Sequence, residues 1–236
     1  NNLSPAGIAM DVNKGPLEKA QEHIREEKLG GKIATRLGNG LAPLEPGETD
    51  TVIIAGMGGD LICKILKAKP EFLIEGKEFI LQPQSEWFKI RRLLKEYRYQ
   101  IEKEWFLKED GKYYVIIKAE PAWTQPQRLK HQQPSIHEYI KEISDTQVNQ
   151  AVSEKDMESI YEQYGKYLIE TKNPVLKEYL EKEIVKKESI AADLKLSIKE
   201  MESEELSGKE RGNIAKRQRR YQEIQKEIRD MRKAIG

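Results

Sequence analysis

The segment TVIIAGMGGDL (Thr51–Leu61) constrains the fold most, because an apolar strand runs directly into a glycine-rich loop and then into a helix. Thr51–Ala55 is typical of a buried strand, and the apolar residues after Gly59 recur at helical spacing. Glycines at such a turn let a ligand approach the backbone, and the first turn of a helix favours negative or electron-rich groups. The segment predicts an α/β domain with a ligand-facing loop.

Three interpretations of the glycine loop Gly56-Met57-Gly58-Gly59 follow from its sequence. A dinucleotide fingerprint needs a third glycine where Leu61 stands, and an acidic residue after the next strand, where Gln82-Pro83-Gln84 stands. Because both are missing, a substrate-facing loop fits better than a pyrophosphate loop. A tight turn that uses glycine only for packing stays open as the third interpretation.

Short apolar runs alternate with helical patterns up to about residue 119. Such alternation favours a parallel sheet with crossover helices. The runs predict strands at Ala6–Met10, Lys32–Leu37 and Phe79–Leu81, and helices at Pro16–Lys28 and Glu86–Tyr97.

The last two strand patterns differ, because Tyr99–Leu107 and Lys112–Ala119 are joined by Glu109-Asp110-Gly111. Asp-Gly between strands is a strong signal for a hairpin. The sheet is therefore expected to end with an antiparallel strand, a shape associated with class I (Rossmann-like) S-adenosylmethionine-dependent methyltransferases. We assign residues 1–119 to this α/β domain.

Residues 120–152 contain three prolines and many glutamines, and they are interpreted as a linker with at most a short helix near Ile136–Ile143. Residues 153–236 are expected to be helical, beginning at a Ser153 cap. Two heptad runs are separated by Ser207-Gly208, which predicts an antiparallel coiled-coil hairpin with arms of roughly 45 Å.

Two polar features follow the expected strands. Asp11 comes directly after Ala6–Met10, where an acidic side chain can accept hydrogen bonds from both hydroxyls of a cofactor ribose. Gly38-Asn39-Gly40 follows the next strand, where methyltransferases often bind adenine. In both places a plain solvated turn is the alternative interpretation.

The whole chain has a net charge of +1, but the charge is unevenly distributed. From Lys209 to Lys233 there are ten cationic and four acidic side chains, a balance of +6. The cluster KRQRR (Lys216–Arg220) is either a surface that follows phosphates or a solvated coiled-coil face.

A single cysteine, Cys63, excludes a disulfide framework and a thiolate metal cluster. His23, His131 and His137 have no metal-ligand spacing, so no metal is expected. The longest apolar runs are far shorter than the ~20 residues that cross a bilayer, so no membrane association is expected. These features fit a cytoplasmic protein.

The chain begins at Asn1 without an initiator methionine, and its first strand pattern follows at once. We therefore expect that the front of the protein is missing; a processed or tagged chain is the alternative. Without a first, central strand, this fragment is expected to be unstable or inactive alone, because buried unpaired backbone groups cost ~1–3 kcal/mol each.

Five segments together carry a resemblance to the bacterial tRNA (adenine(22)-N1)-methyltransferase family. They are GIAMDVNKGPLEKA (Gly7–Ala20), RLGNGL (Arg36–Leu41), DTVIIAGMGGDLI (Asp50–Ile62), ILQPQ (Ile80–Gln84) and GKYYVII (Gly111–Ile117). The likeness covers residues 6–119 and continues more loosely through Tyr164–Glu183.

The resemblance implies an enzyme that uses S-adenosyl-L-methionine as methyl donor and tRNA as acceptor. It assigns cofactor binding to Asp11, Val12, Asn39, Gly40, Ala55 and Gly56. It places Gly56, Met57, Gly58 and Gly59 beside the target base. From the charge distribution, Lys216, Arg217, Arg219 and Arg220 are expected to bind the tRNA body.

This chain departs from the family in two places. The family usually has Asp where this chain has Asn39, which puts adenine binding through that side chain in doubt. The family also has an N-terminal D-I-G-T-D-H-A-Y-L-P segment, thought to hold the catalytic aspartate, so the catalytic residue of this chain is unknown. A monomer is favoured. The alternatives are a methyltransferase for another RNA base or a small molecule, and a non-enzymatic RNA-binding relic.

Overall fold

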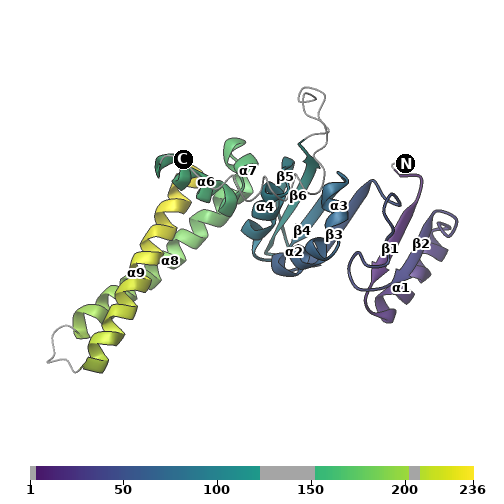
Figure 1. Cartoon of the computed structure of the whole chain (residues 1–236). Coiled ribbons are helices and arrows are strands. Elements are labelled where there is room, and N and C mark those ends of the chain that lie inside the picture. Colours follow the sequence, from purple (N-terminus) through teal and green to yellow (C-terminus); the bar gives the residue numbers. More distant parts are fainter. Residues whose placement is uncertain (1–3, 123–151, 202–207) are drawn as a thin grey trace. The chain divides into compact units, whose positions relative to one another are not determined.

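The computed structural model describes residues 4–122, 152–201 and 208–236 (Figure 1). Most of the expected linker, with the short helix near Ile136–Ile143, lies outside the described residues, as do His131 and His137. The described chain forms two compact units. The first holds residues 4–102 and 117–122, and the second holds residues 103–116 and the described residues from 152 onwards.

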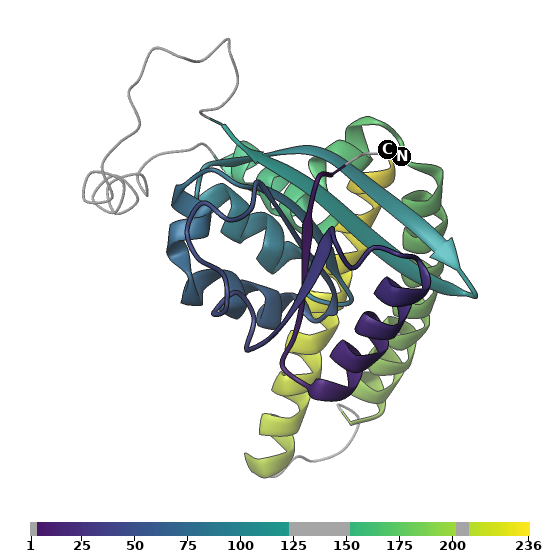
Figure 2. The same cartoon turned by 90° about the vertical axis from the view of Figure 1, so that its right-hand side faces the viewer.

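The first unit begins with two parallel strands and one helix. β1 (Gly7–Asp11) pairs with β2 (Ile33–Leu37), and α1 (Lys14–Glu26) lies against both (Figure 2). The helix starts two residues before Pro16, because the three residues after the cap Asn13 need no amide partner within the helix. Leu17 is the buried residue of this helix.

The other four strands form a second sheet in the order β3-β4-β6-β5. β3 (Thr51–Met57) is parallel to β4 (Glu78–Pro83), and β4 is antiparallel to β6 (Lys112–Pro121), which lies beside β5 (Tyr99–Glu109). Asp110 and Gly111, which connect β5 to β6, both have positive φ, as a tight Asp-Gly turn requires.

β3 is an edge strand among the described strands, since none of them pairs with its outer side. Its residues alternate between buried Val52 and Ile54 and an outward Ile53 that is 68% exposed. The expected central strand between β1 and β3 stays a prediction, and the open edge of β3 is the surface that it would cover.

Three helices connect the strands from β3 to β5. They are α2 (Gly59–Ala68), α3 (Pro70–Ile74) and α4 (Trp87–Glu96), of which α3 was not expected from the sequence. α2 packs against α4. The core of the unit is made by fully buried side chains such as Ile62, Leu66, Phe72, Phe79 and Leu81.

The second unit is mainly helical. α6 (Val152–Tyr164) and α7 (Lys166–Glu170) precede two long helices, α8 (Pro174–Met201) and α9 (Gly208–Ile235). Figures 1 and 2 show α8 and α9 side by side. Asn173 caps α8 by accepting the Val175 and Leu176 amides.

Each of the two long helices, α8 and α9, buries apolar residues. Buried residues include Leu180, Ile184 and Ala191 on α8, and Ile214, Ile224, Ile228 and Met231 on α9. Helices with apolar residues at this spacing bury them against each other.

The connection between β5 and β6 belongs to this second unit, although the sequence suggested a domain boundary after residue 119. The rings of Phe106, Tyr113 and Tyr179 stack with centroids 4.9–5.8 Å apart. Glu178 accepts hydrogen bonds from Lys108 and Lys182, both at 2.6 Å, which lowers its pKa to about 2. No helix in the described residues is long and apolar enough to cross a membrane.

Candidate functional site

The structure brings Asp11 and the Gly38-Asn39-Gly40 turn together, because β1 and β2 are parallel and end side by side. The Gly38 amide donates to the main-chain oxygen of Asp11 at 3.0 Å. Asp11 Oδ1 accepts the Asn13 amide at 2.7 Å. Among the described residues, its second carboxylate oxygen accepts no hydrogen bond. Val12 and the side chain of Asn39 are exposed.

The turn after β2 is shaped by close approaches that leave no space for larger residues. A Cβ atom on Gly38 would lie 2.1 Å from Pro43 Cγ. Gly40 has a φ of +56°, and its Cβ would lie 2.8 Å from Ile65 Cγ2 on α2. The main-chain atoms of the turn therefore lie beside Asp11. A site that binds a planar ring through main-chain atoms needs this arrangement.

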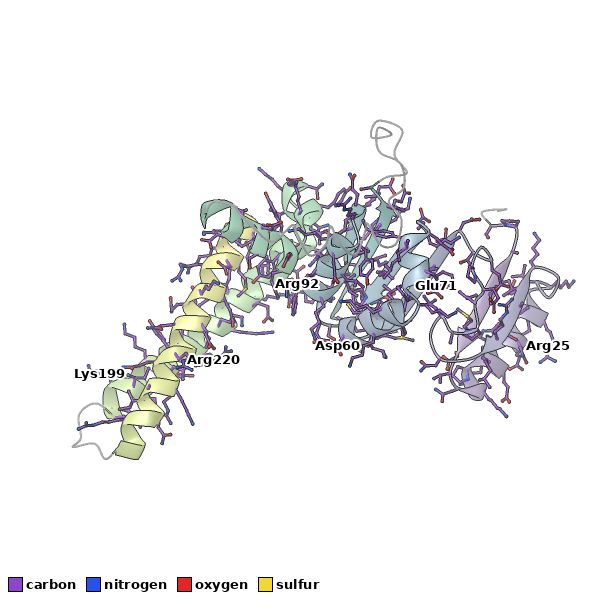
Figure 3. All side chains as sticks on the ribbon, in the orientation of Figure 1. Arg25, Asp60, Glu71, Arg92, Lys199 and Arg220 are labelled. Carbon is purple, nitrogen blue, oxygen red and sulfur yellow. The ribbon has the colours of Figure 1, made fainter. Side chains whose placement is uncertain are left out.

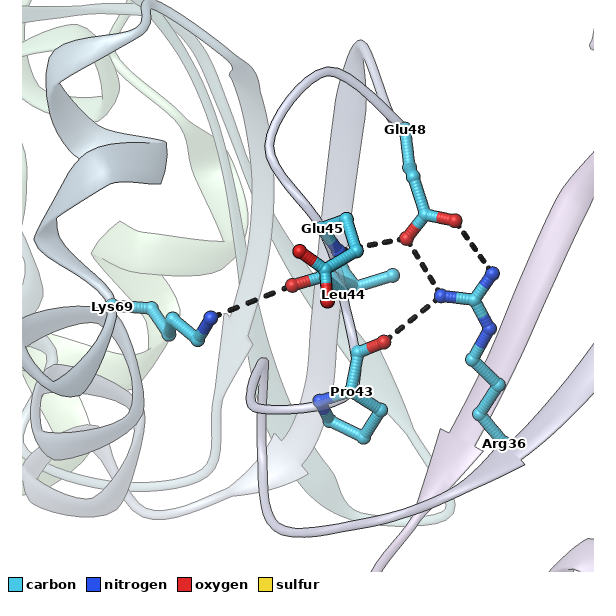
Figure 4. A network of polar contacts seen from close by, with 6 residues as sticks. All are labelled: Arg36, Pro43, Leu44, Glu45, Glu48 and Lys69. Carbon is cyan, nitrogen blue, oxygen red and sulfur yellow. Dashed lines mark hydrogen bonds and ion pairs between the residues drawn. The ribbon is translucent and has the colours of Figure 1, made fainter.

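The ion pair of Arg36 and Glu48 stabilises the conformation of this turn (Figure 4). Arg36 donates to both carboxylate oxygens of Glu48 at 2.6 Å and to the main-chain oxygen of Pro43 at 2.9 Å. The hydrogen bond from Arg36, followed by that from the Glu45 amide, lowers the pKa of Glu48 to about 2. Lys69 Nζ contacts the main-chain oxygen of Leu44 at 3.5 Å and so links the turn to the end of α2. The sequence analysis did not single out Arg36 or Glu48.

The glycine loop Gly56–Gly59 lies against the segment that follows β4. The Gly56 amide donates to Gln82 Oε1 at 2.8 Å, and the Gly59 amide donates to the Ser85 oxygen at 3.0 Å. In the other direction, the Gln84 amide donates to the Met57 oxygen at 2.8 Å. Ala55 and Gly56 are exposed, and Gly56 has a φ of +78°.

A carboxylate of the chain itself occupies the first turn of α2. The Asp60 amide donates to Glu86 Oε2 at 3.1 Å, and Lys89 forms ion pairs with both Glu86 and Asp60. The hydrogen bond from Lys89, followed by that from the Asp60 amide, lowers the pKa of Glu86. The amides of Gly56 in the loop and of Gly59 and Asp60 in the first turn of α2 already have partners, so these three are not available to a pyrophosphate.

The residues at the end of β1 fit the ribose of S-adenosyl-L-methionine. The carboxylate of Asp11 keeps an oxygen that can accept from a hydroxyl, and an ionised carboxylate is purely an acceptor. Beside it, Gly38–Gly40 offers main-chain atoms at a turn that excludes side chains. These residues and the glycine loop belong to the same unit.

The basic cluster on α9 is not one patch. Lys216, Arg217, Arg219 and Arg220 are all exposed, but consecutive helical residues point 100° apart. Arg220, labelled in Figure 3, forms ion pairs with Glu223 at 3.1 Å and Glu227 at 3.4 Å. Lys216, Arg217 and Arg219 form no ion pair with the described residues.

A third group of charges is structural. Glu78, Glu102 and Glu120 have carboxylate oxygens within 4.8 Å of one another, a spacing that a metal ion would accept. Lys118 Nζ lies 2.6–3.2 Å from all three and supplies the positive charge that they need.

Comparisons with known proteins decide the family. The profile of the tRNA (adenine(22)-N(1))-methyltransferase family matches residues 1–162. This chain belongs to that family. A Bacillus subtilis tRNA (adenine(22)-N(1))-methyltransferase is 32% identical over 181 residues, which are 63% of this chain and 75% of that one.

Solved structures show the Rossmann-like methyltransferase fold. One is a putative tRNA (m1A22) methyltransferase of Streptococcus pneumoniae in complex with S-adenosyl-L-methionine. It has 24% identity and a TM-score of 0.65 over 98% of this chain and 82% of its own. TrmK of M. capricolum, bound to S-adenosyl-homocysteine, has 22% identity and a TM-score of 0.62 over 98% and 80%. The expected family, enzyme class and cofactor of the family are thus confirmed.

Proposed function

We propose that this chain transfers a methyl group from S-adenosyl-L-methionine to N1 of adenine 22 in tRNA. The family match supports the reaction class. The hydrogen bonds of the glycine loop are the observation that supports its role. Its amides, which could bind a phosphate, donate instead to groups of the chain itself. A loop in this state suits a neutral, flat ligand such as a base.

The proposed cofactor site lies at the carboxyl ends of β1 and β3. Asp11 accepts the ribose hydroxyls, with Val12 beside it, and Asn39-Gly40 borders the adenine ring through main-chain atoms. Ala55 and Gly56 line the donor side of the glycine loop, and Gly56, Met57, Gly58 and Gly59 face the target base. S-adenosyl-L-methionine supplies an electrophilic methyl group on a sulfonium when it is bound.

The chemistry asks the protein for positioning more than for a strong base. Adenine N1 carries a lone pair that forms the new N–C bond, while the electrons of the S–CH₃ bond return to sulfur. Correct alignment of the two reactants lowers the barrier by converting a bimolecular step into an effectively unimolecular one. The target adenine must first leave its stack. In this proposal Gly56–Gly59 holds the flipped base, and the catalytic residue stays unassigned.

The exposed cations of α9 are proposed to hold the tRNA body. Of the cluster Lys216, Arg217, Arg219 and Arg220, only Arg219 lies opposite the buried residues of α9. Lys226 and Lys233 follow it at intervals of seven residues and are also exposed, and Lys233 forms an ion pair with Asp156 of α6 at 3.9 Å. These three residues, which we call the outer stripe, are spaced by ~10 Å along the helix axis. Phosphates are bound by cations spread in this way along one face.

A methylation assay tests the reaction. Unmodified tRNA and S-adenosyl-L-methionine with a labelled methyl group are incubated with the full-length protein, and the modified position is mapped. We expect label at adenine 22 and none in a tRNA that carries guanine there. Label at another base would support the alternative of a different RNA methyltransferase. Binding of tRNA without methyl transfer or cofactor binding would support the alternative of an RNA-binding relic.

A second experiment tests the outer stripe. The variant Arg219→Gln/Lys226→Gln/Lys233→Gln removes three charges, and Lys186→Gln/Lys195→Gln/Lys199→Gln on α8 is the matched control with the same charge change. We expect only the stripe variant to bind tRNA more weakly. For this variant, the slope of the logarithm of the tRNA binding constant against the logarithm of the salt concentration is expected to become less steep. The change is roughly 0.9 for each lost phosphate contact. Equal weakening in both variants would refute a specific role for the stripe.

Finer features of the architecture belong to the same proposal. We propose that the sheet ends in an antiparallel β5–β6 hairpin, and that α8 and α9 form an antiparallel coiled coil. A further strand is proposed to cover the open edge of β3, where Ile53 is exposed. The monomeric state and the cytoplasmic location stay predictions.

A further inference from the structure

Two side chains, one near the end of β4 and one in the segment after it, hold the glycine loop at its two ends. Gln82 accepts the Gly56 amide at 2.8 Å, and Glu86 accepts the Asp60 amide at 3.1 Å. Between them, hydrogen bonds among main-chain atoms join the two segments. Glu86 also caps α2 and pairs with Lys89, so helix stability accounts for it. Gln82 has no such second role in the described residues.

The amide group of Gln82 is only half satisfied. Its Oε1 receives the Gly56 amide, which also fixes which end of the side-chain amide is oxygen. Its Nε2 is buried from solvent and has no hydrogen-bond partner within the part of the chain that the structure describes. A buried unpaired donor lowers stability, so Nε2 gives no reason for a glutamine at this position. What Gln82 contributes must therefore come through Oε1.

Oε1 acts on a backbone position that the sheet does not hold. The β3–β4 register shifts between Ala55 and Met57, which leaves Gly56 in a bulge outside the regular ladder. Gly56 has a φ of +78°, and, apart from its chain neighbours, no atom of the described residues lies within 4 Å of the place where a Cβ would be. One face of this glycine is therefore open to a ligand, while its amide is held only by Gln82.

We propose that Gln82 is a positioning residue for methyl transfer. Its Oε1 fixes the bulged Gly56 in the positive-φ conformation, and this conformation aims the open face of the glycine loop at the target base. The inference rests on the proposed function, because the loop is assigned to the base there. Since Gln82 acts through Gly56, which also borders the donor, its loss lowers the rate of the transfer step more than it lowers cofactor affinity.

The test compares Gln82→Met with Gln82→Glu in the full chain. Methionine keeps the size of the side chain and removes the acceptor, whereas glutamate keeps the acceptor and removes the unpaired amide donor. Gln21→Met is the control: an exposed glutamine on α1 whose side chain bonds only Thr35 among the described residues. Three quantities are measured: hydrogen exchange at the Gly56 amide, single-turnover methylation of tRNA, and the dissociation constant of S-adenosyl-L-methionine.

We expect faster exchange at Gly56 in Gln82→Met and a transfer rate about 10- to 100-fold lower, because a misplacement of ~1 Å costs about this much. Cofactor affinity should fall by less than the transfer rate, the melting temperature should stay close to that of the wild type, and Gln82→Glu should restore both exchange protection and most of the rate. Unchanged Gly56 exchange in Gln82→Met would overturn the inference. So would a wild-type transfer rate in Gln82→Met, or a Gln82→Glu variant that is as slow as Gln82→Met.

Failure of the proposed function gives a different result. A wild-type protein that leaves tRNA unmethylated refutes the proposed function, and with it the part of the inference that concerns the transfer rate. The exchange measurement still decides whether Gln82 holds Gly56, because it needs neither tRNA nor turnover.

Discussion

Replacing Gly59 by alanine sets two effects of known sign against each other. Gly59 is the first residue of α2, and alanine is a better helix former than glycine by up to about 1 kcal/mol. The new Cβ, however, would lie 2.6 Å from the Glu86 oxygen and 2.7 Å from the Ser85 oxygen. Both are main-chain atoms, so no side-chain rotation relieves the contact.

The steric effect is expected to win. Relief requires the start of α4 to move away from α2 by several tenths of an ångström, while the hydrogen bond from the Gly59 amide to Ser85 holds the two together at 3.0 Å. Overpacking of this kind costs about 1–3 kcal/mol. For a chain of this size, that lowers the melting temperature by about 2–4 °C per kcal/mol.

Differential scanning calorimetry and urea unfolding measure the effect. Gly15→Ala is the matched control, because Gly15 is the second residue of α1 in the same unit and no atom lies within 4 Å of its Cβ position. We expect Gly15→Ala to be neutral or slightly stabilising. A Gly59→Ala variant as stable as the wild type would refute the close approach of the loop to the segment after β4.

Further predictions concern other parts of the chain. The ordinary pKa of Glu48, 4.5, is lowered to about 2 by Arg36, so its contribution to stability is present above 4.5 and is lost as the pH falls towards 2; Glu48→Gln should lack this part of the pH dependence in urea unfolding. Ile228→Ala, at a residue that is 3% exposed, should cost about 2–5 kcal/mol, whereas Leu196→Ala, 60% exposed, should stay within about 0.5 kcal/mol in the same assay. Lys118→Met leaves three neighbouring glutamates without their cation, so it should lower the melting temperature at neutral pH, and added salt should restore part of the loss.

Local patterns predicted the element order because the physical causes are themselves local. The heptads of α8 and α9 and the positive-φ Asp110-Gly111 turn are set by residues adjacent in sequence. The short helix α3 was missed because its five residues are too few for a helical period to show. The division into units was also beyond the sequence, because Phe106 and Tyr113 pack against Tyr179, which lies far along the chain.

The sequence by itself determined the strand, glycine loop and helix at Thr51–Leu61, and the motifs around it were enough to indicate the family. Only the tertiary structure decided which amides of that loop are free, because their partners Gln82 and Glu86 come from a segment about 26 residues later. In the same way, Lys216–Arg220 is one cluster in sequence but is spread around a helix in space. Hydrogen-bond partners and exposed faces depend on distances between segments, which no local pattern contains.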